Sequence, residues 1–342
     1  LFKTDAIISM ADRLLTIVFC LFLLYLPQFA EGFNIYWFVY AQTAALAITA
    51  VAALVAILSH TQLAVRWWKP KFARLILLRA FPFALLSLLM GIYYRIDGVM
   101  IERMLGARGA VEAGIYAASF RLLDALNMFG YLFATLLLPM FARMIRNSES
   151  VSELTRFSGS LLYAFAIVVS INCFVFREWM MQMMYSESDA YWWNIFGWLM
   201  LNFVPMSSVY VFGTLLTANG SLKILNGIAL GGAVLNVVLN LFLIPYKGAL
   251  GAAYATLITQ LLVAAIHVVY ANKTFAIGFS TAGFVRLLLL PVAVSVLAWL
   301  SFSLSVPSIL AFMGSLLAGG TLAVLLGFVP FTKAVSIIQQ RQ

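Results

Sequence analysis

The stretch AFPFALLSLLMGIYYRIDGVMI, residues 80–101, decides the class of fold, because it is long and apolar enough to cross a lipid bilayer as a helix. About 20 predominantly apolar residues are needed for that. Arg95 and Asp97 interrupt the stretch. A charged side chain at membrane depth costs about 2.5–3.5 kcal/mol on insertion scales, so it usually faces a partner or a water-filled cavity. We therefore look for function around these two residues first.

The composition of the whole chain indicates the same environment. Of its 342 residues 64% are hydrophobic and only 10% are charged, with a mean hydropathy of +1.02. A single soluble core could not bury so many apolar side chains, so lipid must serve as solvent. We predict an all-α polytopic membrane protein with about ten transmembrane helices. The predicted spans are residues 13–29, 36–58, 80–101, 114–141, 157–176, 192–216, 224–244, 249–271, 286–304 and 309–330.

The distribution of basic residues predicts the orientation of these spans. An even number of spans leaves both ends of the chain on one side, and if that side is cytoplasmic most of the 21 Lys and Arg residues lie inside. This bias follows the positive-inside rule, and it accounts for the excess over 12 Asp and Glu without a nucleic-acid partner. The basic residues left outside are Arg103, Arg108, Arg177 and Lys247.

The one long polar interruption predicts the organisation into parts. Residues 60–79 are basic and aromatic, which suits a segment lying at the cytoplasmic lipid surface. We interpret this segment as a linker between two membrane units; an ordinary positive loop that only sets orientation is the alternative. The predicted parts are residues 1–59, the linker 60–79, a helical lobe at 80–271, and two additional helices with a tail at 272–342.

A second charged couplet, Arg121 and Asp124, lies in the next predicted span. At 100° per residue these two and the polar residues that follow form a stripe within about 120° of one another. The depths of Asp97 and Arg121 differ by only about 6 Å at 1.5 Å per residue. We therefore predict that Asp97 pairs with Arg121, and that Arg95 reaches Asp124 or a ligand. The rest of the stripe is Asn127, Tyr131 and Thr135.

These charges have a purely structural alternative. An intramembrane ion pair can serve only to hold two helices in register, and a buried pair is weak evidence of either stability or activity.

The span 224–244 carries a pattern for helix packing. Gly227 and Gly231 form a small-xxx-small surface that allows another helix to come close. Asn236 and Asn240, four residues apart, share one face and can hydrogen-bond across helices. We predict close packing here rather than a ligand site.

The residues for catalysis, cofactor binding or metal binding do not come together in the sequence. Both cysteines, Cys20 and Cys173, fall inside predicted spans, so neither a disulfide nor a thiolate metal site is indicated. The outer loop 177–191 has Glu178, Glu187 and Asp189 but no His, and a Walker-type GxxxxGK[ST] motif is lacking. We predict that the chain is not an enzyme and needs no cofactor. A membrane glycan polymerase or glycosyltransferase is the alternative from another class.

Two groups of motifs resemble a known family. The first runs through the charged couplets, and the second through the glycine and asparagine pattern. These motifs are similar to the polysaccharide flippases, the oligosaccharide-exporting branch of the multidrug/oligosaccharidyl-lipid/polysaccharide exporter superfamily. The quoted residues are Tyr94-Arg95-Ile96-Asp97, Ile101, Gly114-Ile115-Tyr116, Leu138-Pro139, Asn219-Gly220, Gly232 to Asn240, Ile244-Pro245 and Gly248 to Thr256.

The resemblance implies exporter-type helical lobes, two of six helices each, sometimes followed by two extra helices. On this basis residues 1–59 are the last two helices of an incomplete first lobe, and the chain is truncated by four helices ahead of Leu1. Such a fragment is not expected to transport by itself.

The resemblance also implies alternating access for a polyprenyl-pyrophosphate-linked oligosaccharide in the bacterial cytoplasmic membrane. The expected partners are this substrate, membrane lipids, a coupling H⁺ or Na⁺, and membrane proteins of glycan assembly. Arg95 and Arg121 are then the substrate-binding candidates, and Asp97 and Asp124 pair with them or bind the coupling ion. The alternative within transport is a cation-coupled antiporter of the multidrug and toxin extrusion type, which would favour a carboxylate-rich cavity.

Overall fold

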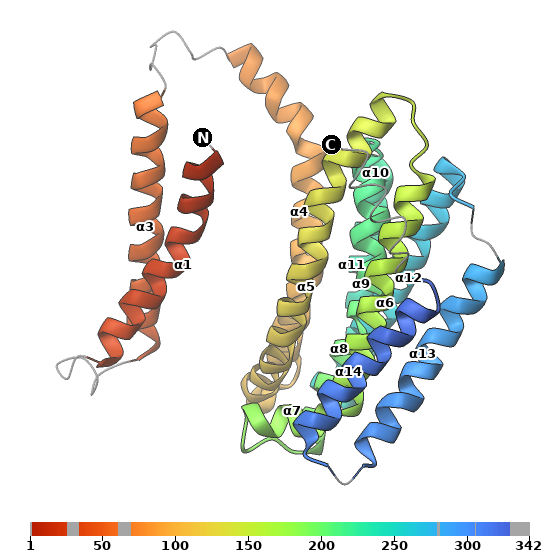
Figure 1. Cartoon of the computed structure of the whole chain (residues 1–342). Coiled ribbons are helices and arrows are strands. Elements are labelled where there is room, and N and C mark those ends of the chain that lie inside the picture. The colour runs from red at the N-terminus through yellow and green to blue at the C-terminus, as the bar shows by residue number, and fades with distance from the viewer. Residues whose placement is uncertain (1, 26–33, 61–69, 279–280, 305, 329–342) are drawn as a thin grey trace. The chain divides into compact units, whose positions relative to one another are not determined.

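The computed structural model describes residues 2–25, 34–60, 70–278, 281–304 and 306–328. Within these ranges all regular structure is helical, which confirms the predicted all-α class (Figure 1). The elements are α1 (Phe2–Tyr25), α3 (Ile35–His60), α4 (Pro70–Met104), the 3-10 turn η2 (Gly106–Arg108), α5 (Gly109–Arg146), α6 (Ser152–Val175), α7 (Arg177–Met184), α8 (Ala190–Leu201), α9 (Phe203–Ser208), the π-helical turn η3 (Val209–Gly213), α10 (Thr214–Ala218), α11 (Leu222–Lys247), α12 (Ala249–Phe275), α13 (Thr281–Phe302) and α14 (Ser308–Leu325).

Nine helical segments of the described ranges are long and apolar enough to cross a membrane. They correspond to nine of the predicted spans, so the chain is a multi-pass membrane protein. The remaining predicted span, 13–29, falls on α1, which is not one of the nine; residues 26–29 lie outside the described residues. The nine segments are Ile35–Ser59, Pro70–Met104, Gly106–Arg146, Ser152–Val175, Ala190–Ala218, Leu222–Lys247, Ala249–Phe275, Gly283–Phe302 and Ser308–Leu325.

The chain divides into two compact units, Leu1–Leu77 and Leu78–Gln342. In the first unit α1 and α3 pack against each other as an antiparallel pair (Figure 1). The boundary falls inside α4, which begins at Pro70 rather than near residue 80. A proline is well tolerated in the first turn of a helix, so α4 can begin at Pro70. Residues 61–69 of the predicted linker lie outside the described residues.

The connection between α4 and α5 is shorter than predicted. In place of a 12-residue outer loop at 102–113, α4 continues to Met104, and α5 starts at Gly109 after the turn η2. The absence of a side chain at Gly109 allows this, because a Cβ there would collide with the backbone carbonyl of Glu102. The result is a tight hairpin that brings the two charged couplets onto neighbouring helices.

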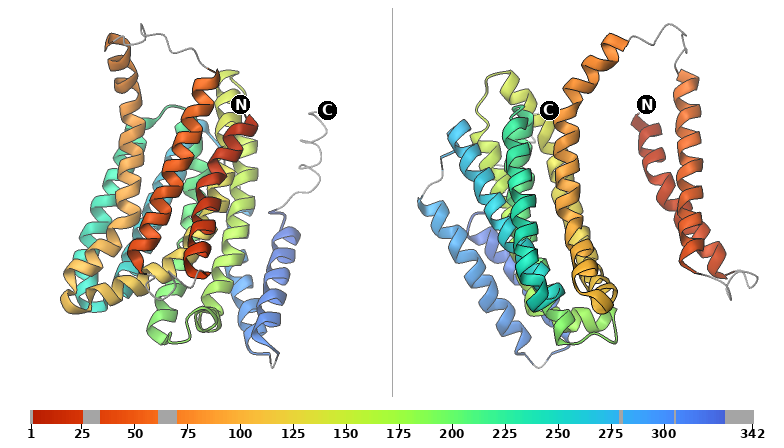
Figure 2. Two further views of the ribbon diagram at one scale, coloured as in Figure 1. Left: turned by 90° about the vertical axis from the view of Figure 1, so that its left-hand side faces the viewer. Right: turned by 180° about the vertical axis from the view of Figure 1, so that it is seen from behind.

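The core of the second unit lies between α5, α6, α8, α9 and α12, where large side chains such as Phe196 and Phe203 are fully buried. α13 and α14 pack on α6, and α11 lies along α12 (Figure 2). The close contact between α11 and α12 depends on Gly232 and Gly251. A Cβ at Gly232 would collide with α12, and a Cβ at Gly251 would collide with the backbone of α11. Gly227 and Gly231 instead face open space in the described part of the chain, so their role in packing stays a prediction.

Candidate functional site

A single buried carboxylate joins four helices of the second unit. The side chain of Asp97 on α4 is only 1% exposed. It accepts hydrogen bonds from Tyr116 Oη on α5 at 2.6 Å, from Asn240 Nδ2 on α11 at 2.6 Å, and from Thr256 Oγ1 on α12 at 2.5 Å. Burial of a carboxylate is strongly unfavourable unless hydrogen bonds or charges compensate it. Three neutral donors supply that compensation here.

The asparagine pair of α11 extends this cluster. Asn240 also donates to Asn236 Oδ1 at 3.1 Å, and Asn236 lies 3.5 Å from Thr256 Oγ1. Because the two asparagines are four residues apart, they present their amides on the same side of α11. We call Asp97, Tyr116, Asn236, Asn240 and Thr256 the Asp97 cluster. Asn240 Oδ1 is buried and accepts no hydrogen bond from the described residues.

The predicted ion pair between Asp97 and Arg121 is wrong. Asp97 bonds to the neutral donors named above, and no described acidic side chain forms an ion pair with Arg121, which is exposed. The predicted depths along the two helices were compatible, but the side chains point in different directions. Asp97 faces α11 and α12, whereas Arg121 lies on the accessible side of α5.

The second expectation, that Arg95 reaches Asp124, is confirmed. Arg95 Nη2 donates to Asp124 Oδ2 at 3.2 Å, and the side chains are 71% and 43% exposed. The Arg95 guanidinium carbon also lies 5.6 Å from the ring centre of Phe120, a cation–π geometry. Both interactions come from Arg95, so this one side chain connects α4 to α5.

The polar stripe of α5 continues from this ion pair on an accessible side of the helix. Arg121, Tyr131 and Thr135 are exposed, and Asp124 and Asn127 are half-buried. The charged groups that share this accessible face are Arg95, Arg121 and Asp124. Since Asp97 is withdrawn into the Asp97 cluster, the face carries two guanidinium groups against one carboxylate.

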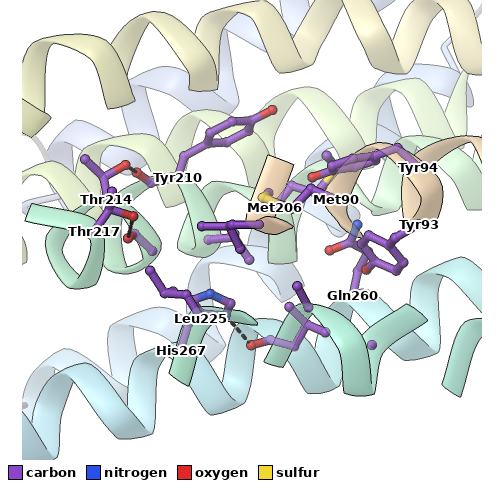
Figure 3. A pocket seen from close by; sticks show the side chains of 16 residues that line it. Met90, Tyr93, Tyr94, Met206, Tyr210, Thr214, Thr217, Leu225, Gln260 and His267 are labelled. Carbon is purple, nitrogen blue, oxygen red and sulfur yellow. Dashed lines mark hydrogen bonds between the residues drawn. The ribbon is translucent and has the colours of Figure 1, made fainter. Parts of the chain in front are cut away.

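A cavity of about 160 Å³ lies close to the Asp97 cluster (Figure 3). It is lined by α4, α11, α12 and the segment from Met206 to Thr217. His267 on α12 is buried against it, and its Nδ1 is 2.8 Å from the carbonyl oxygen of Val263. This cavity could not be predicted from the sequence, because it lies where the π-helical turn η3 interrupts the regular helix.

Two acidic residues at the starts of helices, Asp189 and Glu112, have structural roles that sequence reasoning missed. Asp189 Oδ1 accepts from the backbone N–H groups of Tyr191 and Trp192 and so caps α8. Glu112 Oε2 accepts from Tyr191 Oη at 2.5 Å and from the N–H of Ala249 at 3.1 Å, which joins α5, α8 and the start of α12. In the sequence only the glycine at position 248, next to Ala249, marks this junction, and the structure gives it a positive φ.

A metal centre finds no support in the part of the chain that the structure describes. No group of three or more His, Cys, Asp or Glu side chains comes together there. Cys20 and Cys173 are free thiols, and Cys173 is buried.

Comparison with known proteins finds similarity to transporters. No family model matches the chain. It is 24% identical over 217 residues to the Lipid III flippase of Escherichia coli (strain K12), and to the same extent to the Lipid III flippase of Shigella flexneri. The match covers 63% of this chain and 52% of each relative, so the chain spans about half the length of these curated relatives. The similarity supports the exporter superfamily that the motifs indicated, and it does not single out the polysaccharide branch. Both relatives are flippases rather than enzymes.

Proposed function

We propose that the chain belongs to a flippase that moves a polyprenyl-pyrophosphate-linked oligosaccharide across the bacterial cytoplasmic membrane for polysaccharide biosynthesis. The observation that carries this proposal is the exposure of Arg95 and Arg121 on two helices long enough to span a membrane. Guanidinium groups at membrane depth avoid hydrocarbon and face a partner or a water-filled cavity. The similarity to Lipid III flippases supports a lipid-linked substrate for that cavity.

The chemistry of the head group fits these arginines. A pyrophosphate that leaves bulk water needs its negative charge compensated, and a guanidinium can donate two parallel hydrogen bonds to its oxygens. In the structure Asp124 holds Arg95. We propose that the pyrophosphate competes with the Asp124 carboxylate for Arg95, while Arg121 is available without displacing an acidic partner.

The Asp97 cluster is the proposed site of the coupling ion. Asp97 has only neutral hydrogen-bond donors around it, so binding of one H⁺ or Na⁺ would neutralise a buried charge. Asn240 Oδ1 offers one further oxygen next to the carboxylate. Because the cluster joins α4 to α5, α11 and α12, a change in its charge would alter how firmly α4 is held. That is the kind of helix rearrangement that alternating access requires.

The orientation and organisation complete the proposal. Both ends of the chain lie on the cytoplasmic side, as the positive-inside bias favours. Residues 1–59 contribute helices of a first lobe, 60–79 link the lobes, 80–271 form the second lobe, and 272–342 add two helices. Contact with membrane proteins of glycan assembly would deliver and remove the substrate.

The two alternatives account less well for the same residues. A cation antiporter would favour excess carboxylate on the accessible face, but the face has Arg95 and Arg121 against Asp124 alone, because Asp97 is buried elsewhere. A membrane glycan polymerase or glycosyltransferase would need free acid/base groups outside the spans. Of the loop acids Glu178, Glu187 and Asp189, Asp189 is engaged in capping α8, and no His accompanies the other two in that loop.

Complementation of a flippase-deficient strain tests the proposal. The full-length protein should restore glycan export, and Arg95→Gln combined with Arg121→Gln should abolish it at equal membrane abundance. Arg143→Gln is the matched control, because Arg143 is an exposed arginine on α5, the helix of Arg121, and lies outside the polar stripe. Export by the double variant at the native level would overturn the assignment of these arginines, and drug resistance without glycan export would favour the antiporter.

A further inference from the structure

The cavity of Figure 3 lies one helical turn away from the Asp97 cluster on each of three helices. In each case a residue that lines the cavity is four positions from a residue of the cluster, a rise of about 6 Å. The pairs are Tyr93 with Asp97 on α4, Gly232 with Asn236 on α11, and Gln260 with Thr256 on α12. The cavity therefore ends about one helical turn from the Asp97 cluster, whose own residues do not line it.

The polar groups of the cavity gather at its two ends. In Figure 3 Tyr93, Tyr94 and Gln260 lie at one end, and His267 with Thr214 and Thr217 lies at the other. Between them the lining is apolar, with Met90, Met206 and Leu225. A buried space holds water when it is large enough and offers polar partners, and about 30 Å³ is the share of one water molecule. The 160 Å³ here is large enough for several water molecules.

The end next to Asp97 contains a hydroxyl group with no protein partner. Tyr93 Oη is buried, and none of the described residues forms a hydrogen bond with it. A buried hydroxyl without a partner is unfavourable, and evolution rarely retains one without another use. A water molecule that enters from the cavity would satisfy it. Tyr94 and the Gln260 amide line the same end of the cavity.

The far end contains a histidine with one ring nitrogen available. The carbonyl of Val263 can only accept, so His267 Nδ1 must donate, and the lone pair of the neutral ring is on Nε2. That edge of the ring faces Gly213 in η3, where a Cβ would lie 3.4 Å from His267 Cδ2 and 3.6 Å from Nε2. A π-helical turn with a glycine at this place keeps the histidine edge uncrowded, and such turns are frequent at functional sites.

We propose that this cavity is a hydrated passage through which a proton travels between His267 and Asp97. The inference rests on the proposed coupling role of Asp97, takes H⁺ rather than Na⁺ as the coupling ion, and identifies the route by which the proton reaches the carboxylate. A proton is accepted at His267 Nε2, passes along water past Gln260 and the Tyr93 hydroxyl, and forms an O–H bond on the Asp97 carboxylate. The reverse sequence releases it. The other titratable groups along this route are Tyr94 on α4 and Tyr210 in η3, which line the cavity, and Tyr116 on α5, which donates to Asp97; the α11 residues lining the cavity add none.

Two measurements on the full-length protein in lipid vesicles test the passage. Hydroxyl-radical labelling by water radiolysis reports whether water lies against Tyr93, Met90 and Met206. Infrared spectroscopy after a pH jump reports how fast the Asp97 carboxyl changes protonation, with the band identified by its loss in Asp97→Asn.

The variants distinguish an effect on the water in the cavity from an effect on folding. Ala229→Leu adds three carbons inside the cavity, and Ala265→Leu adds the same atoms on the exposed side of α12 as the matched control. Tyr93→Phe removes only the unpartnered hydroxyl, so it should leave the thermal stability unchanged. We expect Ala229→Leu and Tyr93→Phe to slow the protonation of Asp97 by about tenfold or more. Labelling of Met90 should fall in Ala229→Leu, and Ala265→Leu should match the native protein in both measurements.

The outcomes distinguish this inference from the proposed function. Absence of radical labelling in the native protein, absence of any carboxyl band change, or native exchange rates in both variants would overturn the passage. If exchange slows as expected but Asp97→Asn still exports glycan under the same ion dependence, the passage stands and the coupling role of Asp97 is wrong.

Discussion

The side-chain amide of Asn240 donates a 2.6 Å hydrogen bond to the carboxylate of Asp97 and thereby joins α11 to α4. A second bond between these helices runs from Asn226 Nδ2 to the carbonyl oxygen of Pro82 at 3.0 Å. Polar side chains thus join α4 to α11 at two levels. Hydrogen bonds of this kind can break and form again when a helix shifts. Closely packed apolar side chains, in contrast, resist such a shift.

Loss of the Asn240 bond should destabilise the second unit. Asn240→Ala leaves the buried carboxylate with one donor fewer, at a cost of about 1–3 kcal/mol. We expect a lower midpoint of thermal unfolding in detergent. Asn194→Ala is the control, because Asn194 is half-buried and makes no hydrogen bond through its side chain to the described residues. Equal midpoints for the two variants would contradict the structural role of the bond.

Gly248 should tolerate no side chain. Its φ is +60°, and a Cβ would lie 2.5 Å from Tyr191 Oη and 2.8 Å from Glu112 Oε2. Gly220→Ala is the control, since Gly220 has a φ of +73° but open space around its Cβ position. Gly220→Ala carries backbone strain of about 1 kcal/mol. Gly248→Ala carries about 1–3 kcal/mol, because its ψ of −140° lies in a region that other residues avoid, and it should lose about 1–3 kcal/mol more by breaking the Glu112 bonds. Thermal unfolding of the two variants measures the difference; an equal loss would show that the Glu112 contacts contribute nothing.

Neutralising the buried carboxylate should uncouple transport from the ion gradient. Asp97→Asn keeps the shape of the side chain but removes the charge that H⁺ or Na⁺ would neutralise. In vesicles with an imposed gradient, substrate movement by this variant should no longer respond to the gradient. Asp124→Asn should retain the response, because Asp124 lies on the accessible face. A gradient response in Asp97→Asn would assign coupling to another residue.

Removing the carboxylate that competes for Arg95 should strengthen binding of the head group. An exposed ion pair contributes about 0.2–1 kcal/mol, so Asp124→Asn should tighten binding of a polyprenyl pyrophosphate by up to about fivefold. The effect should disappear when Arg95 is also replaced by Gln, as a double-mutant cycle would measure. Weaker binding in Asp124→Asn would mean that Asp124 positions Arg95 for the substrate instead of competing with it.

Hydropathy predicted the helices well, because every span must be apolar over its whole length. The rotation of each helix about its axis was harder to predict. The depth of Arg121 matched that of Asp97, yet their helices present them to different neighbours, and Asp97 found its donors on α11 and α12, more than 140 residues away. The Arg95–Asp124 pair was accessible to prediction since both groups lie on one hairpin. The cavity beside η3 was not, because a π-helical turn leaves no mark in the periodicity of the sequence.

Translocation by the full-length protein in vesicles tests the central claim most directly. A polyprenyl-pyrophosphate oligosaccharide would be placed in one leaflet, and its arrival in the other would be followed with a glycan-specific enzyme outside. We predict movement by the native protein and by Arg143→Gln, and none above protein-free vesicles when Arg95 and Arg121 are both replaced by Gln. Movement at the native rate by that double variant would contradict the proposal that these two guanidinium groups bind the substrate.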